Sequence, residues 1–168
     1  MTLILVKETG TASATSNSYA NQADGDSYHY AHLYATDWTG ATTANKEKAL
    51  VMATRLIDDY FTFEGRKVDD QQALEWPRFD IYDRSGFLQN SDSIPTAVVN
   101  ATCEMARWLL GEDRTAEEDT RGFTSIKAGS LALTVDAADR TAVMPDSVIK
   151  MLAPYGMPFG GGISKVVR

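Results

Sequence analysis

The sequence predicts a mainly helical α+β fold, in which a bundle of about four helices carries a small β-hairpin and a flexible C-terminal tail. Apolar residues recur at spacings of three and four in two long segments, which is typical of helices that bury one face. A shorter segment alternates on both sides of residues 128–130, as the two strands of a hairpin do. Residues 156–168 contain four glycines and few apolar side chains, so we expect them to form the tail.

The length and composition favour one domain. With 168 residues the chain is close to ordinary domain size, and we divide it into a helical domain of residues 1–155 and a tail of residues 156–168. Apolar residues make up 43% and charged residues 23%, which is ordinary for a globular protein. There is no run of 18 or more apolar residues, and the short apolar start lacks the basic leader of a signal peptide. We therefore expect a soluble protein that is not exported and has no membrane partner.

The charge and the single cysteine exclude several kinds of site. Cys103 has no second cysteine to pair with, which excludes an intrachain disulfide and a multi-cysteine zinc site. The net charge of −7 disfavours a surface that binds phosphates generally, because such surfaces need clustered Lys and Arg. The same acidity suits a protein that must stay soluble, or a passage through which DNA slides without sticking.

The N-terminal part is expected to hold a short strand, a loop and a first helix. Residues 2–7 are rich in β-favouring types, and the small polar residues of Gly10–Ser18 favour turns. A helix is predicted from Gln22 to Ala35. Its apolar residues are expected to pack on the core: Ala23, Tyr30, Ala31, Leu33 and Tyr34.

A central helix is the element on which the others are expected to pack. It begins near Thr43, where the hydroxyl of Thr42 or Thr43 can accept a hydrogen bond from a free amide, and Gly65 offers its stop. The spacing of apolar residues predicts its buried stripe: Ala49, Leu50, Ala53, Leu56, Ile57, Tyr60 and Phe61. The opposite face carries charged residues that can stay in water: Lys46, Lys48, Arg55 and Asp59.

Residues 65–92 show no periodicity, and we expect a long irregular loop that folds back on the core. Within it, Trp76, Pro77 and Arg78 are predicted to anchor the loop. Proline biases Trp76 toward an extended backbone, and the arginine fork can clamp a carboxylate or backbone carbonyls. The acidic residues around Arg78 favour this interpretation. The alternative is a platform for stacking on bases, made of Trp76, Phe79 and Tyr82.

The second half is expected to hold a long helix, a hairpin and a short helix. The long helix is capped by Asp92 or Ser93, with Pro95 in its first turn and Gly111 at its end. Its stripe is Val98, Ala101, Thr102, Met105, Trp108 and Leu109. Residues 122–135 form the predicted hairpin. The short helix opens at Pro145, runs to Leu152 and is stopped by Pro154.

No group of residues predicts catalysis. His29 and His32 lie three apart with acids nearby, but a zinc site needs three or four protein ligands. We interpret them as surface or interface histidines. Cys103 lies near a buried stripe without a charged neighbour that would make it a thiolate, so we expect a core residue. We therefore expect a protein that is not an enzyme and uses no metal or cofactor.

The order and spacing of short motifs along nearly the whole chain resemble those of one protein family. The motifs are Gly10, Asn17-Ser18-Tyr19, Ala23-Asp24, Tyr28, Lys48-Ala49-Leu50, Ala53-Thr54, Asp58, Phe63, Gly65, Gln72-Ala73-Leu74, Trp76-Pro77-Arg78, Ile94-Pro95, Ala101, Glu104 and Leu152-Ala153-Pro154. The chain is similar to phage proteins that carry the family label of DnaT-like single-stranded DNA binding proteins. Members of that family resemble head-to-tail adaptor, or head completion, proteins of tailed phages. The charged Lys7-Glu8 and the long Ser/Thr/Ala stretch before Asn17 depart from the pattern.

The resemblance implies a structural protein of the virion neck, made in the host cytoplasm. Such adaptors are mostly helical, form an oligomeric ring beneath the portal, and let DNA pass through the centre without reading its sequence. The implied partners are further copies of the chain, the portal protein, a downstream tail or neck protein and genomic DNA. The alternative, which the family label carries, is a DnaT-like module that binds single-stranded DNA. The net charge of −7 weighs against that alternative.

The tail is the expected partner-binding segment. Its glycines raise the entropy lost on ordering, so a partner must supply the surface on which it orders. Its apolar side chains would fill grooves on a neighbour while its basic side chains meet carboxylates. These residues are Ile163, Lys165, Val166, Val167 and Arg168.

Overall fold

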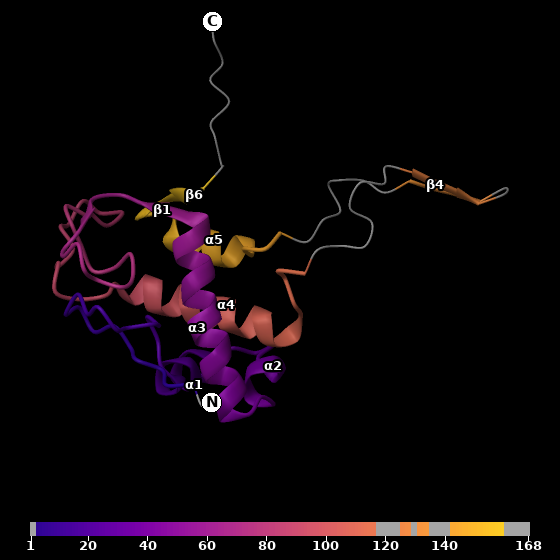
Figure 1. The fold of residues 1–168 in the computed structure, drawn as a ribbon, viewed down its shortest axis with the longest axis horizontal. Helices are drawn as coiled ribbons and strands as arrows, with labels where there is room; N and C mark the ends of the chain where they lie inside the picture. Colours follow the sequence, from indigo (N-terminus) through magenta and orange to yellow (C-terminus); the bar gives the residue numbers. More distant parts are fainter. Residues whose placement is uncertain (1–2, 117–124, 129–130, 135–141, 160–168) are drawn as a thin grey trace, which may run out of the picture.

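The structure is a computed structural model, and it describes residues 3–116, 125–128, 131–134 and 142–159 (Figure 1). Within these ranges the helices are α1 (Gln22–Tyr30), α2 (Thr36–Thr39), α3 (Thr43–Tyr60), α4 (Thr96–Gly111) and α5 (Asp146–Leu152). The strands are β1 (Phe61–Phe63), β2 (Arg66–Lys67), β3 (Arg78–Phe79), β4 (Ser125–Ala128), β5 (Leu131–Thr134) and β6 (Gly156–Pro158). They pair as three antiparallel ribbons, β1 with β6, β2 with β3 and β4 with β5. This confirms the predicted mainly helical α+β fold.

The core lies where α3 crosses α4 (Figure 1). α4 also packs on α1, α2 and α5, so it contacts every other described helix. Most residues of the two predicted stripes are buried, and Leu50, Ile57, Val98 and Met105 are fully buried. At the end of the stripe on α4, Trp108 and Leu109 are half-buried. Burial contributes roughly 1.5–3 kcal/mol for each such side chain, and it fixes α3 with one face toward the core and the other toward solvent. None of the helices in the described ranges is long and apolar enough to span a membrane.

α3 begins where the sequence predicts and ends earlier. The hydroxyl of Thr42 accepts a hydrogen bond from the amide of Asn45 at 3.3 Å and caps the first turn. The helix ends at Tyr60 because the next three residues are extended and pair with β6. Tyr60 is therefore 42% exposed, and Phe61 is buried from a strand rather than from the helix. Gly65 does adopt a positive φ, of 67°, but in the turn after β1.

The helix predicted from Gln22 to Ala35 is wrong, because the structure has two helices here. α1 stops at Tyr30, and α2 brings Trp38 back against α1. The indole ring of Trp38 packs so closely on Gly25 that a Cβ at this position would overlap it. The predicted packing of this segment is also wrong, because Tyr30, Leu33 and Tyr34 are 94%, 83% and 74% exposed. Ala23 and Ala31 are exposed as well.

Lys46 is buried, although the spacing on α3 predicts that it stays in water. Its Nζ lies 2.8 Å from a carboxylate oxygen of Asp26 and 5.0 Å from the centre of the Trp38 ring. The indole N–H of Trp38 donates to the same oxygen at 2.8 Å. The hydrogen bond from Lys46 is the main cause that lowers the pKa of Asp26. This ion pair ties α3 to α1 and holds Trp38 in place.

The N-terminal segment is extended, but the predicted strand is reduced to one bridge between Lys7 and Ser18. The side chain of Asn17 replaces a strand partner, because it accepts from the amide of Val6 at 2.8 Å and donates to the carbonyl of Ile4 at 2.9 Å. Further along, Glu8 is 1% exposed and accepts hydrogen bonds from three amides and two hydroxyls of residues 10–16. The loop therefore folds around a buried carboxylate.

The remaining elements lie close to their predicted ranges. α4 begins after Pro95 with no side-chain cap, so the predicted cap by Asp92 or Ser93 is wrong. β4 and β5 pair around the predicted turn, with Ala128 opposite Leu131. α5 begins directly after Pro145, as predicted.

The C-terminal end of the described chain joins the core. β6 pairs with β1, and Phe61 lies opposite Pro158, so residues 156–158 of the predicted tail form a paired strand. The proposed partner-binding residues of the tail lie outside the described residues: Ile163, Lys165, Val166, Val167 and Arg168.

Candidate nucleic-acid interface

Trp76 holds the long loop against the core and cannot stack on a base. Its ring is fully buried, edge-on to the rings of Phe63 and Tyr155 with centroids 5.6 Å away in both cases. The stacking alternative needs an exposed face on each aromatic ring. Phe79 and Tyr82 are 36% and 56% exposed, but without Trp76 the predicted three-ring platform does not exist.

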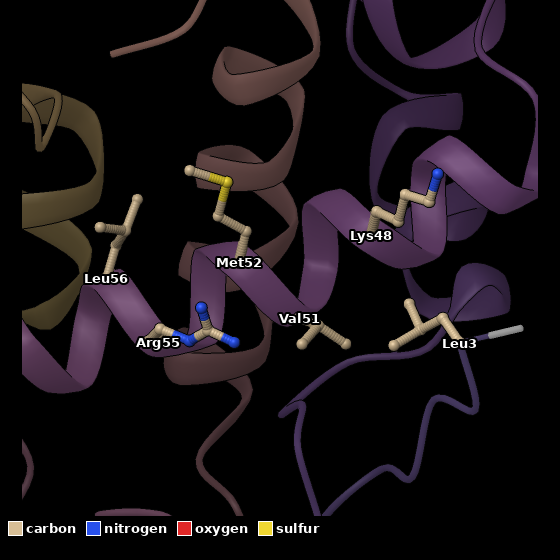
Figure 2. A pocket seen from close by; sticks show the side chains of 6 residues that line it. All are labelled: Leu3, Lys48, Val51, Met52, Arg55 and Leu56. Atoms are coloured by element: carbon tan, nitrogen blue, oxygen red, sulfur yellow. The ribbon is translucent and has the colours of Figure 1, made fainter. Parts of the chain in front are cut away.

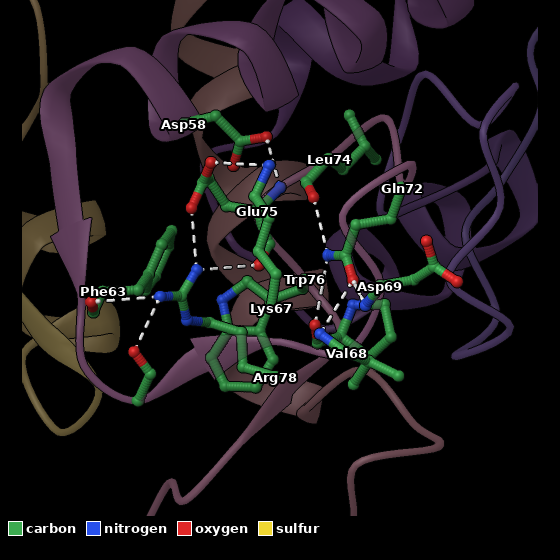
Figure 3. A network of polar contacts seen from close by, with 12 residues as sticks. Asp58, Phe63, Lys67, Val68, Asp69, Gln72, Leu74, Glu75, Trp76 and Arg78 are labelled. Atoms are coloured by element: carbon green, nitrogen blue, oxygen red, sulfur yellow. Dashed lines mark hydrogen bonds and ion pairs between the residues drawn. The ribbon is translucent and has the colours of Figure 1, made fainter.

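Arg78 also holds this loop in place, through hydrogen bonds and an ion pair (Figure 3). Its guanidinium donates to the carbonyls of Glu64 at 2.7 Å and of Glu75 and Gly65 at 3.1 Å. It also pairs with the carboxylate of Glu75 at 2.7 Å, whose other oxygen lies 2.9 Å from Lys67. The peptide bond between Trp76 and Pro77 is cis. Arg78 therefore has its donors occupied and is not available to a phosphate.

Asp58 ties α3 to this loop. Its carboxylate accepts from the hydroxyl of Tyr19 at 2.6 Å and from the amide of Glu75 at 3.1 Å. The Tyr19 hydroxyl in turn accepts from the amide of Trp76 at 3.2 Å. Burial raises the pKa of Asp58 to about 7, and the charge of Glu75 adds to the rise. Burial also raises the pKa of Tyr19 well above its ordinary value.

The two histidines and the cysteine do not form a reactive site. His29 lies in the core, where its Nε2 is 3.1 Å from the carbonyl of Cys103 and burial lowers its pKa. The interpretation of His29 as a surface or interface residue is therefore wrong. His32 Nε2 lies 4.0 Å from a carboxylate oxygen of Glu104. Burial raises the pKa of the Cys103 thiol to about 12, so it stays protonated at neutral pH. The described ranges contain no group of three or more side chains that could hold a metal ion.

Most basic side chains in the described ranges are paired with carboxylates. The pairs are Lys7–Asp24, Lys46–Asp26, Arg66–Asp80, Lys67–Glu75, Arg78–Glu75, Arg107–Glu104 and Arg114–Glu112. Among the described residues, Lys48, Arg55, Arg84 and Lys150 make no ion pair. Lys48 and Arg55 share the outer, exposed face of α3. This face can therefore offer two positive charges to an anion.

Lys48 and Arg55 flank an apolar groove (Figure 2). The groove has a volume of about 340 Å³, and its lining residues are Leu3, Lys48, Val51, Met52, Arg55 and Leu56. All except Leu3 come from successive turns of α3, and Leu3 faces Val51 from the N-terminal segment. The two cations are seven residues apart, which places them about 10 Å apart along the helix axis.

The groove offers two kinds of contact. The ammonium group of Lys48 and the guanidinium fork of Arg55 can bind phosphate oxygens. Val51 and Met52 are only half-buried, so they offer apolar surface to the flat face of a base. The ligand that fits has negative charges along one edge and apolar faces along the other.

The spacing in the sequence predicts only that Lys48 and Arg55 stay in water. One feature of the sequence does indicate an apolar site here. Val51 and Met52 place apolar side chains between the two cations, on a face that is expected to be solvated. The groove itself could not be inferred from the helix alone. Its second wall is Leu3, which folding brings to α3 from a distant part of the chain.

A comparison with protein families gives one result. The family model described as "Putative DnaT-like ssDNA binding protein" matches residues 1–168. No curated protein gives a significant match to the chain. No solved structure does so either.

The family match corrects the expectation of a head-to-tail adaptor. It covers the full chain and describes single-stranded DNA binding. Nothing in the comparisons indicates a virion structural protein, a head completion or neck protein, or a ring bound to a portal. The prediction of a head-to-tail adaptor is therefore wrong, and the alternative of a DnaT-like module is the better supported one.

Proposed function

We propose that this chain, which belongs to the DnaT-like ssDNA binding family, binds single-stranded DNA in the groove on α3. The observation that carries the proposal is the position of two cations that make no ion pair among the described residues, Lys48 and Arg55. They lie on either side of the apolar floor of the groove, which Val51 and Met52 form. Lys48 and Arg55 bind two phosphates of one strand, and the bases lie against Val51 and Met52. We also expect binding without catalysis, and self-association remains a prediction.

The apolar floor favours a single strand over a duplex. In a duplex the flat faces of the bases are stacked on one another, so they cannot contact a protein surface without being unstacked. In a single strand the faces are free, and contacts to them are tolerant of sequence. The phosphate contacts alone would not distinguish the two, since both forms carry a charged backbone.

The net charge of −7 limits the strength of this binding. Nonspecific affinity for DNA comes from neutralised phosphates and released counterions, and the groove supplies two cations. For two phosphate contacts on a single strand, the logarithm of the affinity should fall with the logarithm of the salt concentration with a slope of about −1.4. We therefore expect modest affinity that is measurable at low salt.

The test is a titration of a labelled single-stranded oligonucleotide at several salt concentrations. The double variant Lys48→Gln with Arg55→Gln should bind at least about tenfold more weakly, with a slope near zero, because it removes both phosphate contacts. The matched control is Arg84→Gln with Lys150→Gln, which removes the same charge from exposed sites outside the groove. Like Lys48 and Arg55, these two cations make no ion pair among the described residues. Equal losses in both variants, or no binding by the parent protein, would overturn the proposal.

A further inference from the structure

The groove does not end at Arg55. A second cavity, of about 280 Å³, shares Val51 and Arg55 with it and reaches Asp58 and Asp59, one turn further along α3. We call this second cavity the acidic end of the groove. Its other lining residues are Ser16, Asn17, Ala73 and Leu74. From the groove to this adjoining cavity, the side chains along one face of α3 therefore change from basic to acidic.

Most polar groups at the acidic end are already bonded. The hydroxyl of Ser16 and the amide of Asn17 are used within the N-terminal segment. The Asp58 carboxylate accepts from the hydroxyl of Tyr19 and from the loop. Asp59 is exposed, and within the described residues its side chain makes no hydrogen bond or ion pair. An ionised carboxylate can only accept hydrogen bonds, so Asp59 presents acceptors alone.

An acceptor at this position discriminates between bases. A phosphate is repelled there, so a strand held at Lys48 and Arg55 turns a base rather than its backbone toward Asp59. In a single strand the Watson–Crick edges are free as well. Cytosine presents an N4 amino group that donates at the rim of this edge, whereas the donor of thymine, N3–H, lies between the two acceptors O2 and O4. A carboxylate therefore accepts from the amino group of cytosine, whereas at the N3–H of thymine it is repelled by the oxygens on both sides.

We infer that the acidic end of the groove selects bases with an exocyclic amino group, and that Asp59 makes the protein prefer cytosine to thymine in single-stranded DNA. The inference rests on the proposed function, because it needs a strand in the groove. It adds a preference among bases that phosphate contacts and an apolar floor do not give.

The test compares oligonucleotides of deoxycytidine, thymidine and deoxyuridine at neutral pH and low salt. The parent protein should bind the cytosine strand about fivefold more tightly than the thymine strand. The uracil strand separates the two chemical causes, because uracil lacks both the amino group and the methyl group. It should bind like the thymine strand. Binding like the cytosine strand would assign the preference to the methyl group and overturn the role of Asp59.

The variant Asp59→Asn keeps the size of the side chain but replaces one acceptor oxygen by an amide that donates. The ratio of the affinities for the cytosine and thymine strands should therefore fall to about one. Both affinities should rise slightly, because a negative charge is lost. The control Asp70→Asn removes an exposed charge outside the groove, and it should leave the ratio unchanged. Equal binding of cytosine and thymine strands by the parent protein would overturn the inference alone. Binding of neither would overturn the proposed function and the inference with it.

Discussion

Asp58 is the residue at which the groove, α3 and the long loop meet. It lines the acidic end of the groove and bonds to Tyr19 and to the amide of Glu75. Burial is the largest cause that raises its pKa, from 3.8 to about 7, while these two hydrogen bonds oppose the rise. The folded protein therefore holds a proton on Asp58 at pH values where the unfolded chain has released it.

This difference predicts how stability depends on pH. Between pH 3.8 and about 7 the folded state binds more protons than the unfolded state, so the contribution of Asp58 to stability falls as the pH rises. The slope is at most about 1.4 kcal/mol per pH unit for one group. In Asp58→Asn, which keeps an acceptor for Tyr19, this contribution should be absent. Urea unfolding of the parent and the variant at several pH values in this range gives the difference between their free energies of unfolding. A difference that does not change with pH would contradict the raised pKa.

At the scale of elements, the ribbon of β1 and β6 connects the end of α3 to the end of the described chain. The strands are so close at Gly156 that a Cβ there would overlap the carbonyl of Thr62 and lie 2.9 Å from the Cα of Phe63. Glycine is needed at this position because of the close approach of two backbones.

We expect Gly156→Ala to destabilise the fold by roughly 1–3 kcal/mol, the usual cost of an overpacked site. The matched control is Gly40→Ala, since Gly40 has an ordinary φ of −81° at the end of α2. Thermal unfolding of the two variants gives the comparison. If both unfold at the same temperature as the parent, the pairing of β6 with β1 does not contribute to stability.

The elements also show which parts of the fold could be predicted from the sequence. α3, α4 and α5 could be predicted because periodic apolar residues, proline and glycine act within one segment. The break between α1 and α2 could not, because it depends on the packing of Trp38 against Gly25 and Lys46. β1 and β6 each lack a local signal, since each needs a partner from the other end of the chain.

At the scale of the whole molecule, net charge is a poor guide to the charge of a single surface. The excess of acidic residues suggests that no surface binds phosphate. Within the described ranges, however, most cations are paired with a carboxylate, whereas Lys48 and Arg55 have no such partner there. Which charges are paired depends on tertiary contacts such as the one between Lys46 and Asp26. A sum over the sequence cannot distinguish a neutralised cation from a free one.

The burial of the tryptophan rings has an optical consequence. Trp38 and Trp76 are buried, Trp108 lies against two arginine side chains, and none of the three lines the groove or its acidic end. Saturating the protein with an oligonucleotide should therefore leave its tryptophan fluorescence unchanged. The variant Val51→Trp places an indole on the floor of the groove, and its emission should be quenched as bases stack on it. Quenching in the parent protein would instead place the strand near Trp108, on α4.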